Sequence, residues 1–428
     1  MKKINRKLLA ALSLAILIGW LLWPAYQFFA YNKGSMPLPP FGWLKLPDDG
    51  PSVQEIYDPD YSEAAKLSLT VLEKHRKKVA APAISAAVSA CGRLVWAGAS
   101  GWSDIESRTP VSTATRFRIG STAKALTGTA LARLVQSGRM DLDTPIANYL
   151  DPLPNGEWAQ ITPRQLASHM AGLPDYKENR DWLGLYHTLA LRNHFDSMVE
   201  ALDVFDDNPL LYRPGSRFHY TSFHTVLLGA TMASAAQKNY LQLMQEQVFD
   251  PAGMTATIPS PLNGDHEKGI ATFYKSNGLF GAKHRLREWR PVDLSHRLPG
   301  GGFVSTPSDL VKLGSRYLDT DFISAETREI FWTPQKLANG EANPQHYALG
   351  WRYREMEIPQ LGVLRHANHG GVSRGSQSWL MVLPDYEMSV AVNINRKTEV
   401  FWDFGSVALE IVQAFVQGRS RGDCARDL

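Results

Sequence analysis

Ser121 and Lys124 are the two residues whose types and spacing could together perform covalent chemistry. They lie in FRIGSTAKALTG, where a loop is expected to lead into a helix. Residues three apart share a helix face, so the lysine amine would point at the serine hydroxyl. Backbone N–H groups at a helix N-terminus can also stabilise an oxyanion. The pair could be a nucleophile with its proton acceptor, but Ser is also a favoured helix N-cap and Lys a common helix residue.

Two later elements favour the catalytic interpretation. Tyr220 forms a Tyr-x-Ser element with Ser222 just before an apolar helical segment, and a His-Gly-Gly element at His369 lies on a predicted strand edge. A lysine or tyrosine can act as a base near neutral pH only in a buried, positively polarised site, because their ordinary pKa values are about 10.4 and 10. The hypothesis therefore requires Lys124 and Tyr220 to meet in such a site.

Several longer segments occur in a recognisable order between residues 62 and 415. They are FRIGSTAKALTGTALARLVQSGRMDLDTPIANYL, LASHMAGLPDY, PLLYRPGSRFHYTSF and LPGGGFVSTPSDLVKLG. In them the sequence resembles the serine β-lactamase and penicillin-binding-protein superfamily, specifically its class C and esterase-like branch. The last two segments are most similar to the mitochondrial serine β-lactamase-like proteins and their bacterial relatives.

The resemblance implies catalytic roles for Ser121, Lys124 and Tyr220. Ser121 would be the nucleophile that forms a covalent acyl-enzyme. Lys124 and Tyr220 would share the general-base and general-acid work, with a Tyr220 phenolate as the preferred base for acylation and for activating the deacylating water. The oxyanion hole would consist of the backbone N–H groups of Ser121 and Val372.

Two substrate-binding positions depart from the family pattern. Ser222 stands where lactamases commonly have Asn, and His369-Gly370-Gly371 stands where they commonly have Lys-Thr-Gly. A group that titrates near ~6.5 thus replaces a fixed cation, and a substrate carboxylate loses a permanent partner. We therefore expect an esterase, amidase or peptidase rather than an efficient antibiotic hydrolase, with activity that depends on His369 protonation between about pH 5 and 8.

Two other patterns suggest different chemistry. Ser373 lies in a Gly-x-Ser-x-Gly sequence, but the nucleophile elbow requires a following helix, and SQSWLMVL predicts a strand. The histidine pairs His366 with His369 and His219 with His224 lack an evident third ligand, and the sequence holds no HExxH-type motif. We therefore expect no metal and no other cofactor.

The N-terminus predicts a membrane anchor over residues 1–30. Lys2, Lys3, Arg6 and Lys7 precede an uncharged, mostly apolar segment long enough to cross a bilayer, which places the body outside the cytoplasm, in the periplasm of a bacterial cell. A cleaved signal peptide is the main alternative, although no small-x-small cleavage site follows the apolar segment, and a buried helix is a further alternative.

The rest of the chain predicts one large hydrolase domain over residues 61–418. Residues 31–60 read as a linker without regular structure, because prolines and glycines recur along it, and 419–428 as a polar tail. A hairpin over 83–104, a mainly helical insertion at about 125–290 and strands with a helix at the end predict an α/β fold. By resemblance, this is a β-lactamase/transpeptidase-like antiparallel sheet flanked by helices, with a helical subdomain.

The cysteine content and the net charge bear on disulfide bonding and on the kind of partner. Cys91 and Cys424 are the only cysteines; a bridge is possible in an oxidising compartment, but we expect two unpaired thiols. The net charge is +3 and no dense basic patch is visible, which excludes a nucleic-acid partner. The sequence predicts a membrane-anchored serine hydrolase acting on a small-molecule or peptide amide or ester; the alternative is a catalytically silent envelope protein that uses the same fold for binding.

Overall fold

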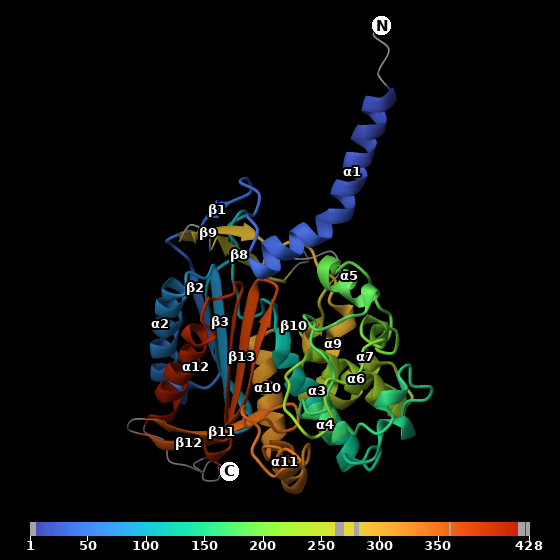
Figure 1. Ribbon diagram of the computed structural model, residues 1–428. Coiled ribbons are helices and arrows are strands. Elements are labelled where there is room, and N and C mark those ends of the chain that lie inside the picture. Colours follow the sequence, from blue (N-terminus) through green and yellow to red (C-terminus); the bar gives the residue numbers. More distant parts are fainter. Residues whose placement is uncertain (1–5, 262–268, 278–281, 359–360, 418–423, 425–428) are drawn as a thin grey trace.

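The computed structural model describes residues 6–261, 269–277, 282–358, 361–417 and 424. An antiparallel sheet of order β11-β12-β13-β14-β3-β4-β2 forms the main layer (Figure 1). The strands are β2 (Ser52–Ile56), β3 (Ala83–Ala90), β4 (Arg93–Asp104), β11 (Arg352–Ile358), β12 (Gly362–Ser373), β13 (Ser376–Leu383) and β14 (Met388–Ile394).

Helices cover both faces of this sheet, and for that reason every residue of β3, β13 and β14 is buried. Helices α2 (Ser62–Lys78) and α12 (Phe401–Val416) pack together on one face. Helix α10 (Pro307–Leu318) packs against β3, β13 and β14 on the other face, and the Thr306 hydroxyl caps it by accepting a hydrogen bond from the Asp309 N–H.

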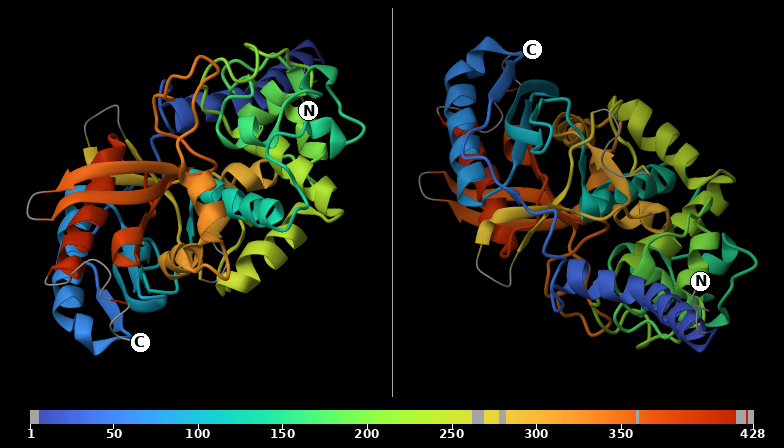
Figure 2. Two further views of the ribbon diagram at one scale, coloured as in Figure 1. Left: turned by 90° about the horizontal axis from the view of Figure 1, so that it is seen from below. Right: turned by 90° about the horizontal axis from the view of Figure 1, so that it is seen from above.

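The helical subdomain lies beside the α10 face of the sheet (Figures 1 and 2). It contains α3 (Ala123–Gln136), α4 (Pro163–Ala167), α5 (Trp182–Ala190), α6 (Ser222–Ala236), α7 (Tyr240–Met244), α8 (Asp250–Ala252) and α9 (Leu298–Gly301). The predicted insertion at 125–290 is mainly helical up to Ala252. Its last part contains the strands β7 (Ile258–Pro259), β8 (Tyr274–Asn277) and β9 (Ala282–Glu288). Buried apolar residues of α3, α6 and α10 form one continuous core.

The expectation of an irregular linker over 31–60 is wrong in part. Ser52–Ile56 forms β2, which pairs with β4 and extends the main sheet, and β1 (Leu44–Lys45) pairs with β9. The prolines explain the error, since Pro51 stands directly before β2 and leaves a five-residue segment without proline. Gln54 fixes this edge strand further by accepting a 3.0 Å hydrogen bond from the Trp96 indole.

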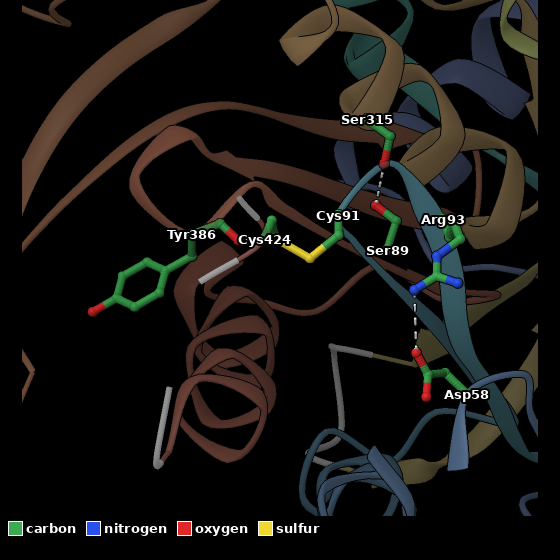
Figure 3. The surroundings of a disulfide bond; sticks show 7 residues. All are labelled: Asp58, Ser89, Cys91, Arg93, Ser315, Tyr386 and Cys424. Atoms are coloured by element: carbon green, nitrogen blue, oxygen red, sulfur yellow. Dashed lines mark hydrogen bonds and ion pairs between the residues drawn. A yellow bond between two sulfur atoms is a disulfide. The ribbon is translucent and has the colours of Figure 1, made fainter. Parts of the chain in front are cut away.

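The prediction of two unpaired thiols is also wrong. Cys91 lies in the turn between β3 and β4, and its sulfur is bonded to that of Cys424 (Figure 3). The two residues are 333 positions apart, so the sequence carried no information on their distance. The fold places Cys424 beside the β3–β4 turn. The rest of the predicted polar tail lies outside the described residues.

The N-terminal helix α1 (Arg6–Gln27) projects away from the body and continues into a π-helical turn, Phe28–Lys33 (Figure 1). Leu9–Lys33 is long and apolar enough to cross a membrane, and most of it is exposed. A signal sequence at this position would have the same length and composition. Two residues of the π-helical turn, Ala30 and Tyr31, are buried against the body.

Candidate active site

Ser121 and Lys124 lie where the sequence predicts them, at the N-terminus of α3. Ser121 is in the single helical turn Gly120–Thr122, which leads directly into the helix. The Lys124 amine is 3.2 Å from the Ser121 Oγ and donates further hydrogen bonds to the Ser222 Oγ at 3.1 Å and to the carbonyl of Gly300 at 2.9 Å. The amine is therefore held against the hydroxyl that it would deprotonate.

The electrostatic surroundings of Lys124 favour its neutral form. The side chain is fully buried. Burial, followed by the nearby cations of Arg297 and Arg352, holds the pKa of the Lys124 amine well below its ordinary value. A neutral amine has a lone pair that can accept the proton of Ser121, which a lysine in water near neutral pH does not have.

Tyr220 completes the cluster from the segment before α6. Its ring centroid is 5.0 Å from the Lys124 Nζ and 5.4 Å from the Arg352 guanidinium carbon. Burial raises the pKa of the Tyr220 phenol, although Arg352 and a hydrogen bond with Ser121 act in the opposite direction. The predicted resting phenolate is therefore not favoured. These opposite pKa shifts favour a protonated Tyr220 and make Lys124 the better candidate for the proton acceptor.

The surroundings of His369 do not support the predicted charge role. Its side chain is fully buried, and its Nδ1 lies 2.9 Å from the carbonyl oxygen of Gly370, so Nδ1 carries the hydrogen. Its Nε2 lies 2.9 Å from the Tyr347 hydroxyl and accepts that hydrogen bond, with Arg352 Nη1 at 3.4 Å. Burial and the cation of Arg352 hold the pKa of His369 well below its ordinary value. These surroundings favour the neutral imidazole.

Arg352 and Arg354 supply the fixed cations that the sequence analysis missed. Both are on β11, which pairs with β12, with Arg352 opposite Asn368 and Arg354 opposite His366. Residues two apart on a strand share a face, and both side chains line the same cavity as Ser121. The Arg-x-Arg spacing in WRYREMEI was the available signal, but its meaning depends on β11 lying beside β12.

A cavity of about 610 Å³ opens at Ser121. Its polar part includes Ser121, Tyr220 and the two arginines, whereas its apolar part consists of Met356, Trp379, Phe401 and Trp402. None of the described residues that line it is acidic. The cavity can therefore accept a molecule with a negative charge and an apolar group, with a carbonyl placed at Ser121.

The predicted substrate-binding positions divide into two groups. Gly370 and Val372 line the cavity, whereas Ser222, His369 and Gly371 lie behind its surface. Ser222 is buried and accepts hydrogen bonds from Lys124 and, at 3.4 Å, from Arg297. It is placed to position the lysine rather than to touch a substrate.

Two glycines bring β12 against the nucleophile turn. A Cβ on Gly371 would lie 1.9 Å from the carbonyl oxygen of Ile119, and one on Gly120 would lie 2.8 Å from the Val372 nitrogen. Gly120 also has φ +51°, which favours glycine. This close approach places the backbone of Val372 beside Ser121, the arrangement that the predicted oxyanion hole needs.

Neither the second serine motif nor an acidic cluster adds to the site, although His366 lines the same cavity as Ser121. Ser373 ends β12 and is followed by strand β13, so the nucleophile-elbow geometry is not present there. Among the described residues, the acidic group Asp181, Asp206 and Asp207 has donor atoms close enough for a cation, and none of these residues lines the cavity.

This fold, together with a serine and a buried lysine at the N-terminus of one helix, defines the class of β-lactamase and transpeptidase-like proteins. The beta-lactamase family model matches residues 70–407, and the chain belongs to that family.

Curated relatives and solved structures agree with this assignment. The chain is 28% identical to the mitochondrial serine beta-lactamase-like protein LACTB of Mus musculus, over 78% of this chain and 75% of the relative. The Homo sapiens protein of the same name is 29% identical over 76% and 73%. The D-amino acid amidase from Ochrobactrum anthropi SV3, 21% identical, superposes with a TM-score of 0.65 over 83% of this chain and 99% of the amidase. This last likeness shows the fold alone.

Proposed function

We propose that the protein is a membrane-anchored serine hydrolase that cleaves an amide or ester bond through an acyl-Ser121 intermediate. The observation that carries this proposal is the buried Lys124 amine, 3.2 Å from the Ser121 hydroxyl, in surroundings that lower the pKa of the amine. Burial of a lysine with a lowered pKa beside a serine hydroxyl is typical of a catalytic lysine rather than of one that only supports a helix.

The arrangement supports a simple order of proton transfers. Ser121 Oγ attacks the substrate carbonyl carbon while its proton moves to Lys124 Nζ, and the backbone N–H groups of Ser121 and Val372 stabilise the negative oxygen. Tyr220 gives its proton to the leaving nitrogen or oxygen as the carbonyl–heteroatom bond breaks, and the proton on Lys124 then restores Tyr220. In a second round, water attacks the acyl carbon while one of its protons moves to Lys124 Nζ. The bond between the acyl carbon and Ser121 Oγ then breaks, and Ser121 takes that proton from Lys124.

The cavity supports a substrate that carries an anionic group. Arg352 and Arg354 line it together with an apolar surface of aromatic residues. Guanidinium groups pair with carboxylates through charge-assisted hydrogen bonds. We propose that the substrate has a carboxylate, or a similar anion, near its scissile bond and an apolar portion beside Trp379 and Phe401.

Active-site labelling tests the nucleophile. A fluorophosphonate probe should label the wild type, and peptide mass spectrometry should find the added mass on Ser121. Ser121→Ala should remove the label, whereas Ser373→Ala, a matched change at the second serine motif, should retain it. Equal labelling of wild type and Ser121→Ala would contradict the proposal. A folded wild type that is never labelled would favour the silent binding protein.

We also propose that the body lies outside the cytoplasm. The span Leu9–Lys33, with lysine and arginine residues before it, supports this orientation. The Cys91–Cys424 bond supports it independently, because disulfides persist mainly in oxidising compartments. A membrane-impermeant thiol reagent, applied to intact cells after reduction, should reach Cys91.

A further inference from the structure

Helix α5 (Trp182–Ala190) exposes large apolar side chains to an unusual degree. Trp182 is 84% exposed, Leu183 52%, Tyr186 46% and Leu185 37%. The helix has only nine residues, so these four form most of its outer surface. Single exposed apolar residues are ordinary, but a contiguous group on one element indicates an interaction site.

The apolar side chains of α5 are exposed because of the way the helix packs against the body. Its inner face consists of small or polar residues, and a Cβ on Gly184 would lie 1.7 Å from the carbonyl oxygen of Val204. The Asp181 side chain caps the helix by accepting a 2.9 Å hydrogen bond from the Gly184 N–H. The glycine thus holds α5 tightly to the body in one orientation, with its bulky apolar residues outward.

The neighbour of α5 is the proposed membrane span. Helix α1 contacts α5, and Arg192 Nη2 donates a 3.5 Å hydrogen bond to the Gln27 side chain at the end of α1 (Figure 1). The view from above places the lower part of α1 over the same region of the helical subdomain (Figure 2). The end of the span that leaves the bilayer therefore lies beside the exposed apolar residues.

We propose that α5 is a second membrane contact, whose Trp182, Leu183 and Tyr186 side chains enter the interfacial layer of the bilayer that α1 crosses. The inference rests on the proposed role of α1 as a span.

Three features select a lipid surface over a second copy of the chain as the occupant. Trp and Tyr are enriched at the membrane–water interface, and short helices with one apolar face lie in its plane. The exposed cations Arg180 and Arg192 lie just before and just after the helix, where phosphate headgroups would meet them. The contact continues the surface at which α1 already meets the body.

Depth-dependent fluorescence quenching tests the proposal on the full chain in lipid nanodiscs of phosphatidylcholine and phosphatidylglycerol. Leu183→Cys is labelled with an environment-sensitive fluorophore, and nitroxide lipids quench it from shallow or deep positions. The native cysteines are bonded to each other and leave the new thiol as the labelling site. The controls are Leu14→Cys, within α1, and Ile330→Cys, an exposed apolar residue on α11 (Ala325–Trp332), at the end of the body far from α1 (Figure 1).

We expect shallow nitroxides to quench the Leu183 label at least twofold more than the Ile330 label, and deep nitroxides to quench the Leu14 label most. A quenched Leu14 label with equal, weak quenching at Leu183 and Ile330 would overturn the α5 contact and leave the anchor intact. A Leu14 label that lipids do not quench would overturn the anchor itself. A Leu183 signal that changes with protein concentration but not with nitroxide lipid would overturn the lipid assignment and indicate a contact between two copies.

A polar variant provides an independent readout. Trp182→Ser with Tyr186→Ser should reduce the shallow quenching of the Leu183 label at least twofold while the Leu14 label stays unchanged. Both residues are exposed, so the circular dichroism spectrum and the thermal midpoint should match those of the parent. Unchanged quenching in this folded variant would count against the proposal.

Discussion

At the scale of single residues, the proposed chemistry depends on the positive charges that surround Lys124. Arg297 is buried, contacts Ser222, and is the largest charged contributor after burial to the lowered pKa of Lys124. Arg352 acts on Lys124, Tyr220 and His369 together. Together with burial, these cations lower the pKa of the Lys124 amine, whereas Ser121, Lys124 and Tyr220 supply the reacting atoms.

Arg297→Gln should move the pH dependence of acylation. Activity needs the neutral amine, so the rate rises with pH through the pKa of Lys124. Removing a nearby cation stabilises the protonated amine and raises that pKa, which moves the acidic limb of kcat/KM to higher pH. Arg297→Lys keeps the charge and should leave the limb close to its original position. A limb in the same place for both variants would show that Arg297 does not act through Lys124.

His369 should contribute no titration of its own. Because burial and Arg352 hold its pKa well below the ordinary value, the kcat/KM profile of the wild type should show no separate inflection near pH 6.5. The His369 imidazole can be followed directly by NMR of the 15N-labelled protein, with exposed His284 as the internal comparison. A His369 resonance that titrates between pH 5 and 8 would restore the charge role predicted from the sequence.

Arg354→Gln should selectively weaken the binding of substrates that carry a negative charge. A charge-assisted hydrogen bond contributes about 1.5–3 kcal/mol, so KM for a substrate with a carboxylate should rise roughly tenfold or more. An uncharged ester should change little. Arg365→Gln is the matched control, since Arg365 is on β12 but pairs with Asp385 and does not line the cavity. An equal rise in KM for charged and neutral substrates would show that Arg354 does not bind the substrate anion.

At the scale of elements, the site depends on how closely β12 approaches the turn before α3. Gly371→Ala places a methyl group 1.9 Å from the carbonyl oxygen of Ile119, and Thr122 Oγ1 also bonds across this contact to the His369 carbonyl at 3.3 Å. Moving β12 away would displace the Val372 N–H from the oxyanion.

Gly371→Ala should therefore lower kcat about 100-fold, the effect of losing one oxyanion donor, and destabilise the fold by about 1–3 kcal/mol. Gly156→Ala is the control, because nothing lies within 4 Å of the added methyl there. An activity assay measures the change in kcat, and the midpoint of urea unfolding measures the loss of stability. A Gly371→Ala variant with normal kcat would show that β12 does not set the oxyanion site.

The elements that the sequence could predict are those with a local signal. The 83–104 hairpin, the helix after Ser121 and the last helix follow from apolar periodicity and turn residues, and the structure has all of them. The family motifs located Ser121, Lys124 and Tyr220. The arginines of β11, the burial of His369 and the pairing of β2 depend on strand neighbours distant in the chain, which no local pattern contains.

At the scale of the whole molecule, the Cys91–Cys424 bond joins the β3–β4 turn to the segment after α12. Cys424→Ser should destabilise the protein by about 2–4 kcal/mol, because the bond restricts the unfolded chain over a long loop. The urea midpoint measures this. Cys91→Ser and the double variant should match the single Cys424→Ser variant, since either change removes the same bond. A double variant clearly less stable than both singles would mean that the thiols contribute by packing instead.

The same bond also makes the Cys91 sulfur a marker of synthesis as far as Cys424. The sulfur stays a free thiol until Cys424 has been synthesised and lies beside the β3–β4 turn. A polypeptide that stops before Cys424 therefore carries a free thiol in that turn. The redox state of this one sulfur atom thus reports whether translation has passed Cys424 and the two residues have met.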